Sequence, residues 1–400
     1  MNGLGRNFRK LWTASAVSNL GDGVRLAALP LLAATLTRDP ALVAGLTVML
    51  WLPWLLLSLV AGAVVDQVDR RRLMAAAQGL RMMVVALLGG AVWMGWAGLP
   101  LLYAVAFLMG AAETLFDTAA QAIIPSVVAP SQLEPANARL IGAEIVANQF
   151  VGPPLGAVLF GLAAAVPFLF DAATFAVAAF LLVALQGSFR PIQDDTRRRL
   201  GRRIYEGLTW LGRHRLLRAV TFMVALVNLF YASTSAIFVL FALEILGLDE
   251  LGFGVLLAMF AVGASLGTVA AHRVTQVLGP GTVALTAFSV GGAAQIAIGL
   301  FSRPVAVGAM LVVQGIGFAI FNVTFRSLRQ AVVPDTLLGR VVGSQRALGY
   351  GAIPAGAALG GLMARALGLR APFLVAGVAL VLVALVSTPF VNNRAIAEAS

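Results

Sequence analysis

Five ionisable side chains lie deep inside long apolar stretches, where burying a charge is costly. Asp22 stands between two glycines, and Arg25 follows three residues later on nearly the same helix face, so the two can form an ion pair. Glu113 and Asp117 are four residues apart in a later stretch. Arg81 lies in the stretch before them, and we expect it to pair with Asp117 or with Glu113.

The chemistry open to such residues is proton exchange. Burial favours the protonated form of a carboxylate, whereas a neighbouring arginine favours the charged form. A carboxylate whose arginine partner moves can therefore load and release a proton. Our hypothesis names Asp22 first and Glu113 second as proton carriers, and the alternative is a set of fixed structural ion pairs.

The sequence lacks the residues that thiol, metal or nucleotide-binding sites would require. The chain has no cysteine, two histidines and a single lysine, Lys10. Thiolate sites, a histidine metal cluster and a phosphate-binding Gly-Lys loop are thereby excluded. We expect no metal, no cofactor and no enzymatic activity.

The composition identifies the elements that must position these charges. Of 400 residues, 60% are hydrophobic and 11% are charged, against about 25% charged in soluble domains. This predicts an all-α polytopic membrane protein. Twelve apolar segments are long enough to span a bilayer. They are residues 11–36, 41–65, 73–96, 99–124, 140–162, 165–187, 219–243, 252–274, 281–301, 304–331, 341–364 and 371–391.

The net charge of +11 follows from topology. With the N-terminus inside, most basic residues fall in cytoplasmic loops, as the positive-inside rule requires. We therefore expect a multi-pass protein of the cell (inner, cytoplasmic) membrane with both termini cytoplasmic, and no cleaved signal peptide. The side of the lipid bilayer on which each loop lies accounts for most of the basic residues, and we expect the bilayer but no nucleic acid as a partner.

The arginine-rich stretch 188–218 divides the chain. It predicts an N-terminal six-helix bundle over 1–187, a basic cytoplasmic linker with an interfacial helix, and a C-terminal six-helix bundle over 219–400. The halves repeat weakly: Phe116-Asp117 recurs as Phe321-Asn322. Internal repeats are typical of secondary transporters.

The loop after the second segment, Gly62-x-x-x-Asp66-Gln67-x-Asp69-Arg70-Arg71, resembles the signature loop of the major facilitator superfamily. Gly62, Asp66, Arg70 and Arg71 match that signature, while Gln67 replaces an arginine and Asp69 a glycine. The resemblance implies two pseudo-symmetric bundles of six helices, with Asp66 latched onto the eleventh helix.

Two further motifs narrow the resemblance. Gly152-Pro153-Pro154-Leu155-Gly156-Ala157 resembles an element of drug:proton antiporters, and the run from Phe116 to Ala138 resembles the macrolide-efflux and enterobactin-exporter branch. Gly152, Pro153 and Gly156 then form either a gating hinge or a packing interface. Glu144 and Arg346, at related positions of the two halves, are candidates for a cytoplasmic gate.

In this superfamily the first, fourth, seventh and tenth helices line the substrate cavity. Besides the embedded charges, this nominates seven side chains, namely Asn19, Asn228, Phe230, Tyr231, Gln314, Phe321 and Asn322. Asp171, near the outer end of the sixth segment, can instead reach the membrane interface.

Together these features favour a monomeric secondary transporter that exports amphipathic or cationic small molecules in exchange for protons by alternating access. The alternative is a facilitator with another cargo, such as a sugar or metabolite importer or a lysophospholipid flippase.

Overall fold

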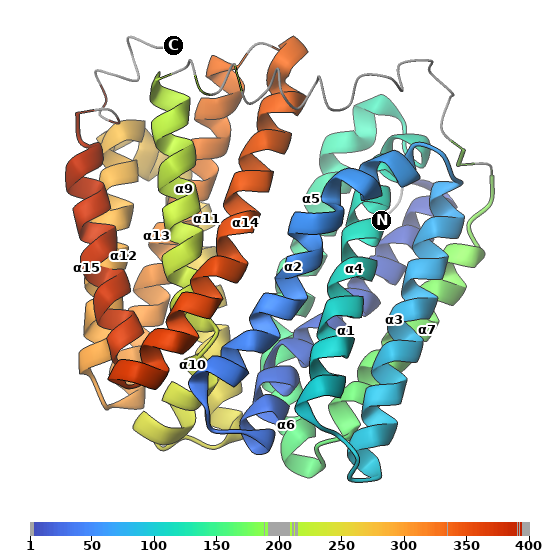
Figure 1. Ribbon diagram of the computed structural model, residues 1–400. Helices are drawn as coiled ribbons and strands as arrows, with labels where there is room; N and C mark the ends of the chain where they lie inside the picture. Colours follow the sequence, from blue (N-terminus) through green and yellow to red (C-terminus); the bar gives the residue numbers. More distant parts are fainter. Residues whose placement is uncertain are drawn as a thin grey trace. The chain divides into compact units, whose positions relative to one another are not determined.

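A computed structural model gives the fold (Figure 1). Every regular element in the part of the chain that it describes is a helix. The described residues are 4–187, 189–190, 209, 212, 215–333, 335–389, 391 and 393. The predicted linker helix falls within 188–218 and lies almost entirely outside them.

The helices of the first half are, in order, α1 (Gly5–Leu36), α2 (Pro40–Val65), α3 (Arg70–Trp93), α4 (Leu99–Ile123), the short 3₁₀ turns η1 (Ile124–Ser126) and η2 (Pro130–Gln132), α5 (Leu133–Glu144), the π-helical segment η3 (Ile145–Val151), α6 (Gly152–Leu162) and α7 (Val166–Val183). Those of the second half are α9 (Arg215–Ser235), α10 (Phe238–Leu240), the π-helical segment η5 (Phe241–Ile245), α11 (Glu250–Leu278), α12 (Pro280–Leu300), α13 (Pro304–Val332), α14 (Asp335–Leu367) and α15 (Ala371–Ser387).

Local sequence accounts for the helix ends. Proline stands in the first turn of α4, α6, α7, α12, α13 and α15. It has no backbone N–H, but an N–H at this position would have no acceptor within the helix, so no hydrogen bond is lost. Asp69 caps α3 by accepting the backbone N–H of Arg72 at 3.2 Å. Gly95 and Gly279 adopt positive φ in tight connections between helices.

Nine helical stretches of the described chain are long and apolar enough to cross a membrane, and α15 is a shorter apolar helix. With α1 and α14, which have 32 and 33 residues, they make the twelve-helix membrane fold predicted from the sequence. The fifth span is α5, η3 and α6 in succession, so it is interrupted by a π-helical segment.

The chain forms two compact units. The first contains residues 1–38, 49–194 and 248–258, and the second contains 39–48, 195–247 and 259–400. The start of α2 thus belongs to the second unit, and the start of α11 to the first. The domain boundaries inferred from the linker stay a prediction.

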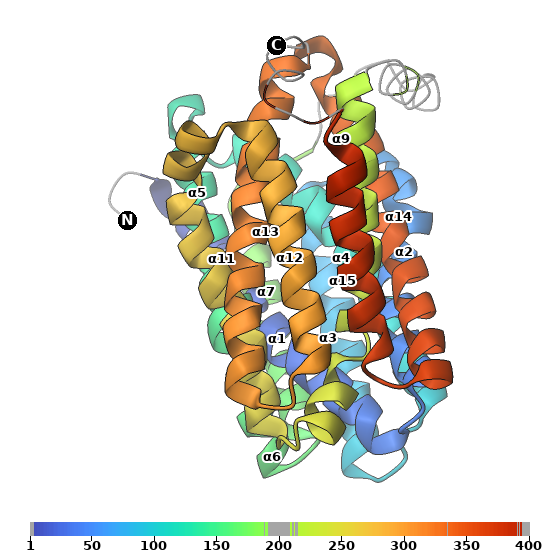
Figure 2. The ribbon, with the colours of Figure 1, turned by 90° about the vertical axis from the view of Figure 1, so that its left-hand side faces the viewer.

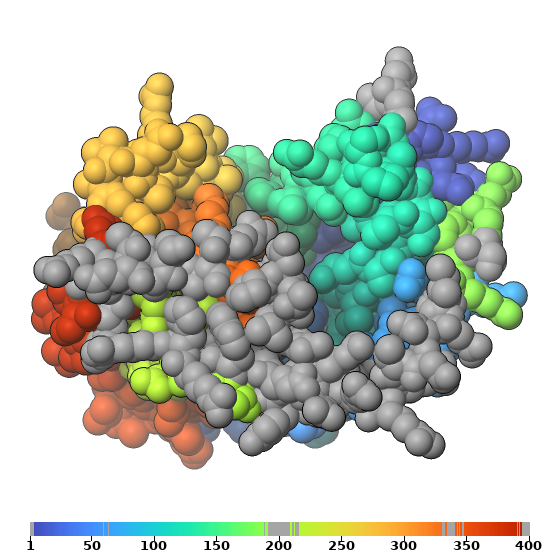
Figure 3. All heavy atoms as spheres, turned by 90° about the horizontal axis from the view of Figure 1, so that it is seen from above, coloured from blue at the N-terminus to red at the C-terminus, as the bar shows by residue number. Residues whose placement is uncertain are grey.

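Each unit has its own apolar core. In the first, Leu11, Met74, Ile123 and Leu182 bring α1, α3, α4 and α7 together. Many side chains of α5 are exposed, and teal atoms of this part of the chain lie on the face seen in Figure 3. In the second, the helices α9, α12, α13 and α15 run side by side (Figure 2). Their shared core includes Met223, Phe288, Phe321 and Leu380.

Candidate functional site

The first unit contains a group of four charged residues that pair with one another: Asp22 and Arg25 from α1, Arg81 from α3 and Asp171 from α7. Arg25 Nη2 lies 2.6 Å from Asp22 Oδ1, and Arg25 Nε lies 3.3 Å from Asp171 Oδ2. Arg81 Nη2 pairs with the same Oδ1 of Asp22. Two positive and two negative charges therefore balance inside the bundle.

Glycines on both sides of Asp22 allow this assembly. A Cβ on Gly21 would run into Thr174 and Asp171 of α7, and one on Gly23 would lie 2.8 Å from the backbone oxygen of Ala147 in η3. Because neither residue has a side chain, α7 and η3 approach α1 closely enough to enclose Asp22.

Arg81 is held on its remaining sides by polar and aromatic neighbours. Its Nη1 donates to Gln78 Oε1 at 3.4 Å, and Gln78 Nε2 donates to Ser18 Oγ on α1 at 2.9 Å. The guanidinium carbon lies 4.2 Å from the centre of the Phe175 ring and 5.9 Å from that of Phe116. Arg81 is 1% exposed, so it occupies one fixed position between three helices.

These contacts confirm one predicted pair and correct another. Asp22 and Arg25 do pair. The expected pairing of Arg81 with Asp117 or Glu113 is wrong, because Arg81 pairs with Asp22 on α1 instead. Sequence reasoning also allowed the side chain of Asp171 to reach the membrane interface, whereas in the structure it is fully buried beside Arg25. The available signal for Asp171 was its position inside an apolar segment, because an embedded charge needs a partner.

Glu113 and Asp117 lie one turn apart on α4 and are partly buried. Among the described residues, no basic group lies within 4.0 Å of either carboxylate. The neighbouring hydroxyls of Thr114 and Thr118 donate to carbonyls of their own helix at 2.7 Å. The first unit therefore holds two embedded acids that no arginine partner compensates directly.

The signature loop binds helix ends in the same unit. Arg70 Nη1 donates to the carbonyl of Ala122 at 3.0 Å, and Arg71 Nη1 to that of Leu185 at 2.7 Å. The Ala122 carbonyl lies in the last turn of α4, and the Leu185 carbonyl lies two residues beyond the C-terminal end of α7; a cation is favourable near such helix ends. Asp66 is exposed, and a Cβ on Gly62 would meet no atom within 4 Å. The latch between Asp66 and the eleventh helix stays a prediction.

The glycines of the fifth span form a packing contact. Gly152 and Gly156 face Gly23 and Val24 of α1, where added Cβ atoms would collide with backbone atoms. Pro153 lies in the first turn of α6, two residues after the π-helical segment ends at Val151. Whether this contact also acts as a hinge stays a prediction.

The second unit repeats this contact. Gly356 and Gly360 of α14, in the run Gly-Ala-Ala-Leu-Gly, face Leu229 and Ser233 of α9 with the same lack of room for a Cβ. The spacing matches that of Gly152 and Gly156, so both units join a pair of helices by the same small-residue motif.

The proposed gate is only partly described. Glu144 is exposed at the C-terminal end of α5. The side chain of Arg346 lies outside the described part of α14, so the pairing of the two stays a prediction. The described residues contain no group of three or more His, Asp or Glu side chains arranged to hold a metal ion.

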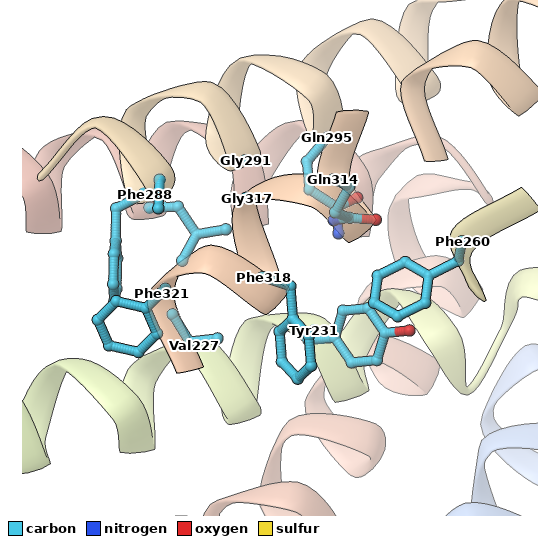
Figure 4. Close-up of a pocket in the computed structure, with 12 residues that line it drawn as sticks. Val227, Tyr231, Phe260, Phe288, Gly291, Gln295, Gln314, Gly317, Phe318 and Phe321 are labelled. Atoms are coloured by element: carbon cyan, nitrogen blue, oxygen red, sulfur yellow. The ribbon is translucent and has the colours of Figure 1, made fainter. Parts of the chain in front are cut away.

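The second unit contains a cavity of about 50 Å³ between α9, α11, α12, α13 and α15 (Figure 4). Aromatic rings form much of its wall, and two glutamine amides provide polar atoms. Its lining residues are Val227, Tyr231, Phe260, Ala287, Phe288, Gly291, Gln295, Gln314, Gly317, Phe318, Phe321 and Leu380.

The model of the transmembrane secretion effector family matches residues 5–398. The chain belongs to this family of the major facilitator superfamily. It is therefore a transporter of the superfamily that the signature loop indicated.

Relatives and solved structures agree with this assignment. The multidrug efflux pump Tap of Mycobacterium tuberculosis is 26% identical over 393 residues, covering 94% of this chain and 91% of the pump. Tap of Mycolicibacterium fortuitum is also 26% identical, covering 94% and 93%. A mutant of the nucleoside transporter NupG shares the fold with a TM-score of 0.79 at 13% identity, covering 97% of this chain and 100% of that one. A bacterial homologue of the iron transporter ferroportin gives 0.76 at 17% identity, with 96% and 98% covered.

Only some of the predicted cavity residues line the cavity of the second unit. Tyr231, Gln314 and Phe321 line the cavity of the second unit. Phe230 packs against the apolar core of that unit instead. The three asparagines bind backbone carbonyls: Asn228 Nδ2 donates to Gly349 on α14 at 3.0 Å, and Asn19 and Asn322 donate to carbonyls one turn earlier in their own helices.

Sequence reasoning missed Phe260, Phe288, Gln295 and Phe318. It considered only the helices that line the cavity in related transporters, whereas α11 and α12 supply Phe260, Phe288 and Gln295. A buried glutamine in an apolar helix was the available signal, because an embedded amide needs a partner.

Proposed function

We propose that this transporter is a proton-coupled exporter of amphipathic or cationic small molecules that works by alternating access. The observation that carries the proposal is a difference between the embedded acids: one has arginine partners, and two have none at ion-pair distance among the described residues. Asp22 is fully compensated by two arginines, whereas Glu113 and Asp117 have no basic partner within ion-pair distance among the described residues.

That contrast assigns different roles to the acids. The group of Asp22, Arg25, Arg81 and Asp171 is electrically neutral and closed, so a proton added to it would break existing ion pairs. An uncompensated carboxylate in an apolar bundle is cheaper to bury in its neutral form and ionises when water or a cation reaches it. We therefore assign proton exchange to Glu113 and Asp117, and to Asp22 the role of fixing Arg25 and Arg81.

Export of chemically varied molecules is supported by similarity to the Tap multidrug efflux pumps along nearly the whole chain. The proposal includes a monomer in the cell membrane with both termini cytoplasmic, on the basis of the distribution of arginines in the loops. The anchoring of Arg70 and Arg71 on the ends of α4 and α7 supports a signature loop that moves as part of the first unit.

The test is transport into inside-out vesicles that contain the purified protein. A panel of amphipathic cations and neutral compounds is offered with an acidic vesicle interior, with and without an uncoupler. We expect accumulation that disappears when the uncoupler collapses the pH gradient. Accumulation that is indifferent to the uncoupler would rule out proton coupling and favour a facilitator.

A further inference from the structure

Two buried polar contacts join α1 to α3 in the first unit. Gln78 Nε2 donates to Ser18 Oγ at 2.9 Å, and one turn further along both helices Arg81 Nη2 pairs with Asp22 Oδ1. Ser18, Gln78 and Arg81 are each at most 2% exposed. Because residues three or four apart in a helix are neighbours, the two contacts lie on one face of α1 and one face of α3.

Gln78 also binds Arg81 directly. Its Oε1 accepts a hydrogen bond from Arg81 Nη1 at 3.4 Å, while Nη2 of the same guanidinium pairs with Asp22. A guanidinium has donors only, so the amide must turn its oxygen to Arg81 and its nitrogen to Ser18. Both outer nitrogens of the guanidinium are thus bonded, one to α3 and one to α1.

Helix α4 holds two further acceptors near Arg81. The guanidinium carbon lies 5.9 Å from the centre of the Phe116 ring, and Phe116 stands between Glu113 and Asp117 in the sequence. The charge of Arg81 acts on both of these carboxylates, yet the ion pair that it forms is with Asp22. The position of one side chain therefore separates a compensated acid from two uncompensated ones.

The other charges around the α4 acids cannot take the place of Arg81. Asp22 and Arg25 act on them from α1, and Glu144 acts from the end of α5. Two of these three residues are acids, and Arg25 is already paired with Asp22 and Asp171. Among the described residues, Arg81 is thus the cation whose position determines whether the α4 acids have a basic partner.

Loss of the Gln78 amide would leave Arg81 Nη1 buried without an acceptor. An unbonded buried donor is costly, and a carboxylate is a stronger acceptor for a guanidinium than a neutral group. The guanidinium would then turn toward the carboxylates of α4.

We infer that Gln78 is a positioning residue, which holds Arg81 on α1 and thereby leaves the two acids of α4 without a basic partner. The inference rests on the proposed function for the statement that those acids exchange protons. It adds the residue that keeps them available for this exchange.

Thermal unfolding of the full-length protein in detergent measures the effect of an α4 acid in two backgrounds. In the wild type, Asp117→Asn removes an uncompensated charge, so the melting temperature should stay unchanged or rise. Gln78→Met keeps the length of the side chain and loses both hydrogen bonds. In that background Asp117→Asn, or Glu113→Gln, removes the new partner of Arg81, so the melting temperature should fall by at least about 2 °C.

The conservative variant Gln78→Glu separates positioning from packing. It keeps an oxygen that accepts from Arg81, and the hydroxyl of Ser18 can donate to its second oxygen. Neutralising either α4 acid should therefore have the same effect in Gln78→Glu as in the wild type. Gln78→Leu is a second apolar variant and should behave like Gln78→Met.

Gln345→Met is the matched control in the second unit. Gln345 is 6% exposed, donates to Thr221 Oγ1 at 2.7 Å and accepts from Arg329 Nη1 at 3.2 Å, so it makes the same two kinds of contact as Gln78. Its loss should lower the melting temperature without changing the effect of Asp117→Asn.

Transport into inside-out vesicles is the second measurement, made with the compounds of the panel that the wild type accumulates. Gln78→Met should lower gradient-driven accumulation at least about tenfold, and Gln78→Glu should keep it. The inference is overturned if neither α4 acid changes the sign of its effect in Gln78→Met, if Gln78→Glu behaves like Gln78→Met, or if Gln78→Met transports like the wild type. Because unfolding is measured without cargo or gradient, its result is distinct from that of the uncoupler experiment, which bears on proton coupling alone.

Discussion

Arg81 on α3 forms an ion pair with Asp22 on α1 while its guanidinium carbon lies 4.2 Å from the centre of the Phe175 ring on α7. One side chain thus joins three helices of the first unit. Because the pair is buried, its attraction contributes little net stability, but removing one partner would leave an uncompensated buried charge and destabilise the protein.

Loss of Arg81 should therefore destabilise the protein strongly. Arg81→Gln removes one of the two partners of Asp22, and breaking a buried pair typically costs about 3–5 kcal/mol. Arg81→Lys keeps the charge but loses the planar contact with Phe175, so we expect an intermediate loss. Thermal unfolding in detergent is the measurement, with Arg303→Gln as the exposed control. Equal melting temperatures for Arg81→Gln and Arg303→Gln would contradict a structural role for the pair.

The acids should divide into two classes. Glu113→Gln and Asp117→Asn remove charges without a basic partner, so we expect an unchanged or higher melting temperature and a fall of at least about tenfold in gradient-driven transport. Asp22→Asn leaves two arginines undercompensated and should lower the melting temperature. Vesicle transport and thermal unfolding are measured together on each variant.

Glu134→Gln is the control for these acids, since Glu134 is exposed in the first turn of α5. If Glu113→Gln and Asp117→Asn both kept the full response to the pH gradient, the assignment of proton exchange to α4 would fail. A loss of coupling in Asp22→Asn without a loss of stability would return the proton-carrying role to Asp22.

The contact between α6 and α1 should not tolerate a methyl group. Gly156→Ala places a Cβ against the backbone of Val24, and relief of such overpacking typically costs about 1–3 kcal/mol. Gly161→Ala, on the same helix, meets no atom within 4 Å and should be neutral or slightly stabilising. Gly360→Ala in the second unit should behave like Gly156→Ala. Indistinguishable unfolding of Gly156→Ala and Gly161→Ala would exclude a tight contact.

Arg71 should stabilise the end of α7. Arg71→Ala removes the hydrogen bond to the Leu185 carbonyl, and a bond to a charged donor contributes about 1.5–3 kcal/mol. Arg72→Ala is the neighbouring control, because Arg72 is exposed and its backbone N–H, not its side chain, binds Asp69. Hydrogen exchange at the C-terminal turn of α7 should rise in the first variant and stay unchanged in the second.

Composition and hydropathy were enough to predict the class of protein and the twelve helices, and the resemblance of the loop from Gly62 to Arg71 to a known signature indicated the superfamily. Hydropathy and helix length depend on composition over about 20 residues, so they can be read without knowing any contact. The pair of Asp22 and Arg25 was equally accessible, because residues three apart in a helix are neighbours whatever surrounds them.

The partners that distant residues take could not be predicted in this way. Arg81 was expected to bind α4 and binds α1, because helix rotation and packing select among several acids at similar depth. Asp171 could have reached the interface from its place in the sequence, and only the packing of α7 against α1 shows that it is buried. The cavity around Gln295 likewise depends on side chains from five helices. A helical repeat shows which residues share a face, but the glycine contacts that bring helices together determine what each face meets.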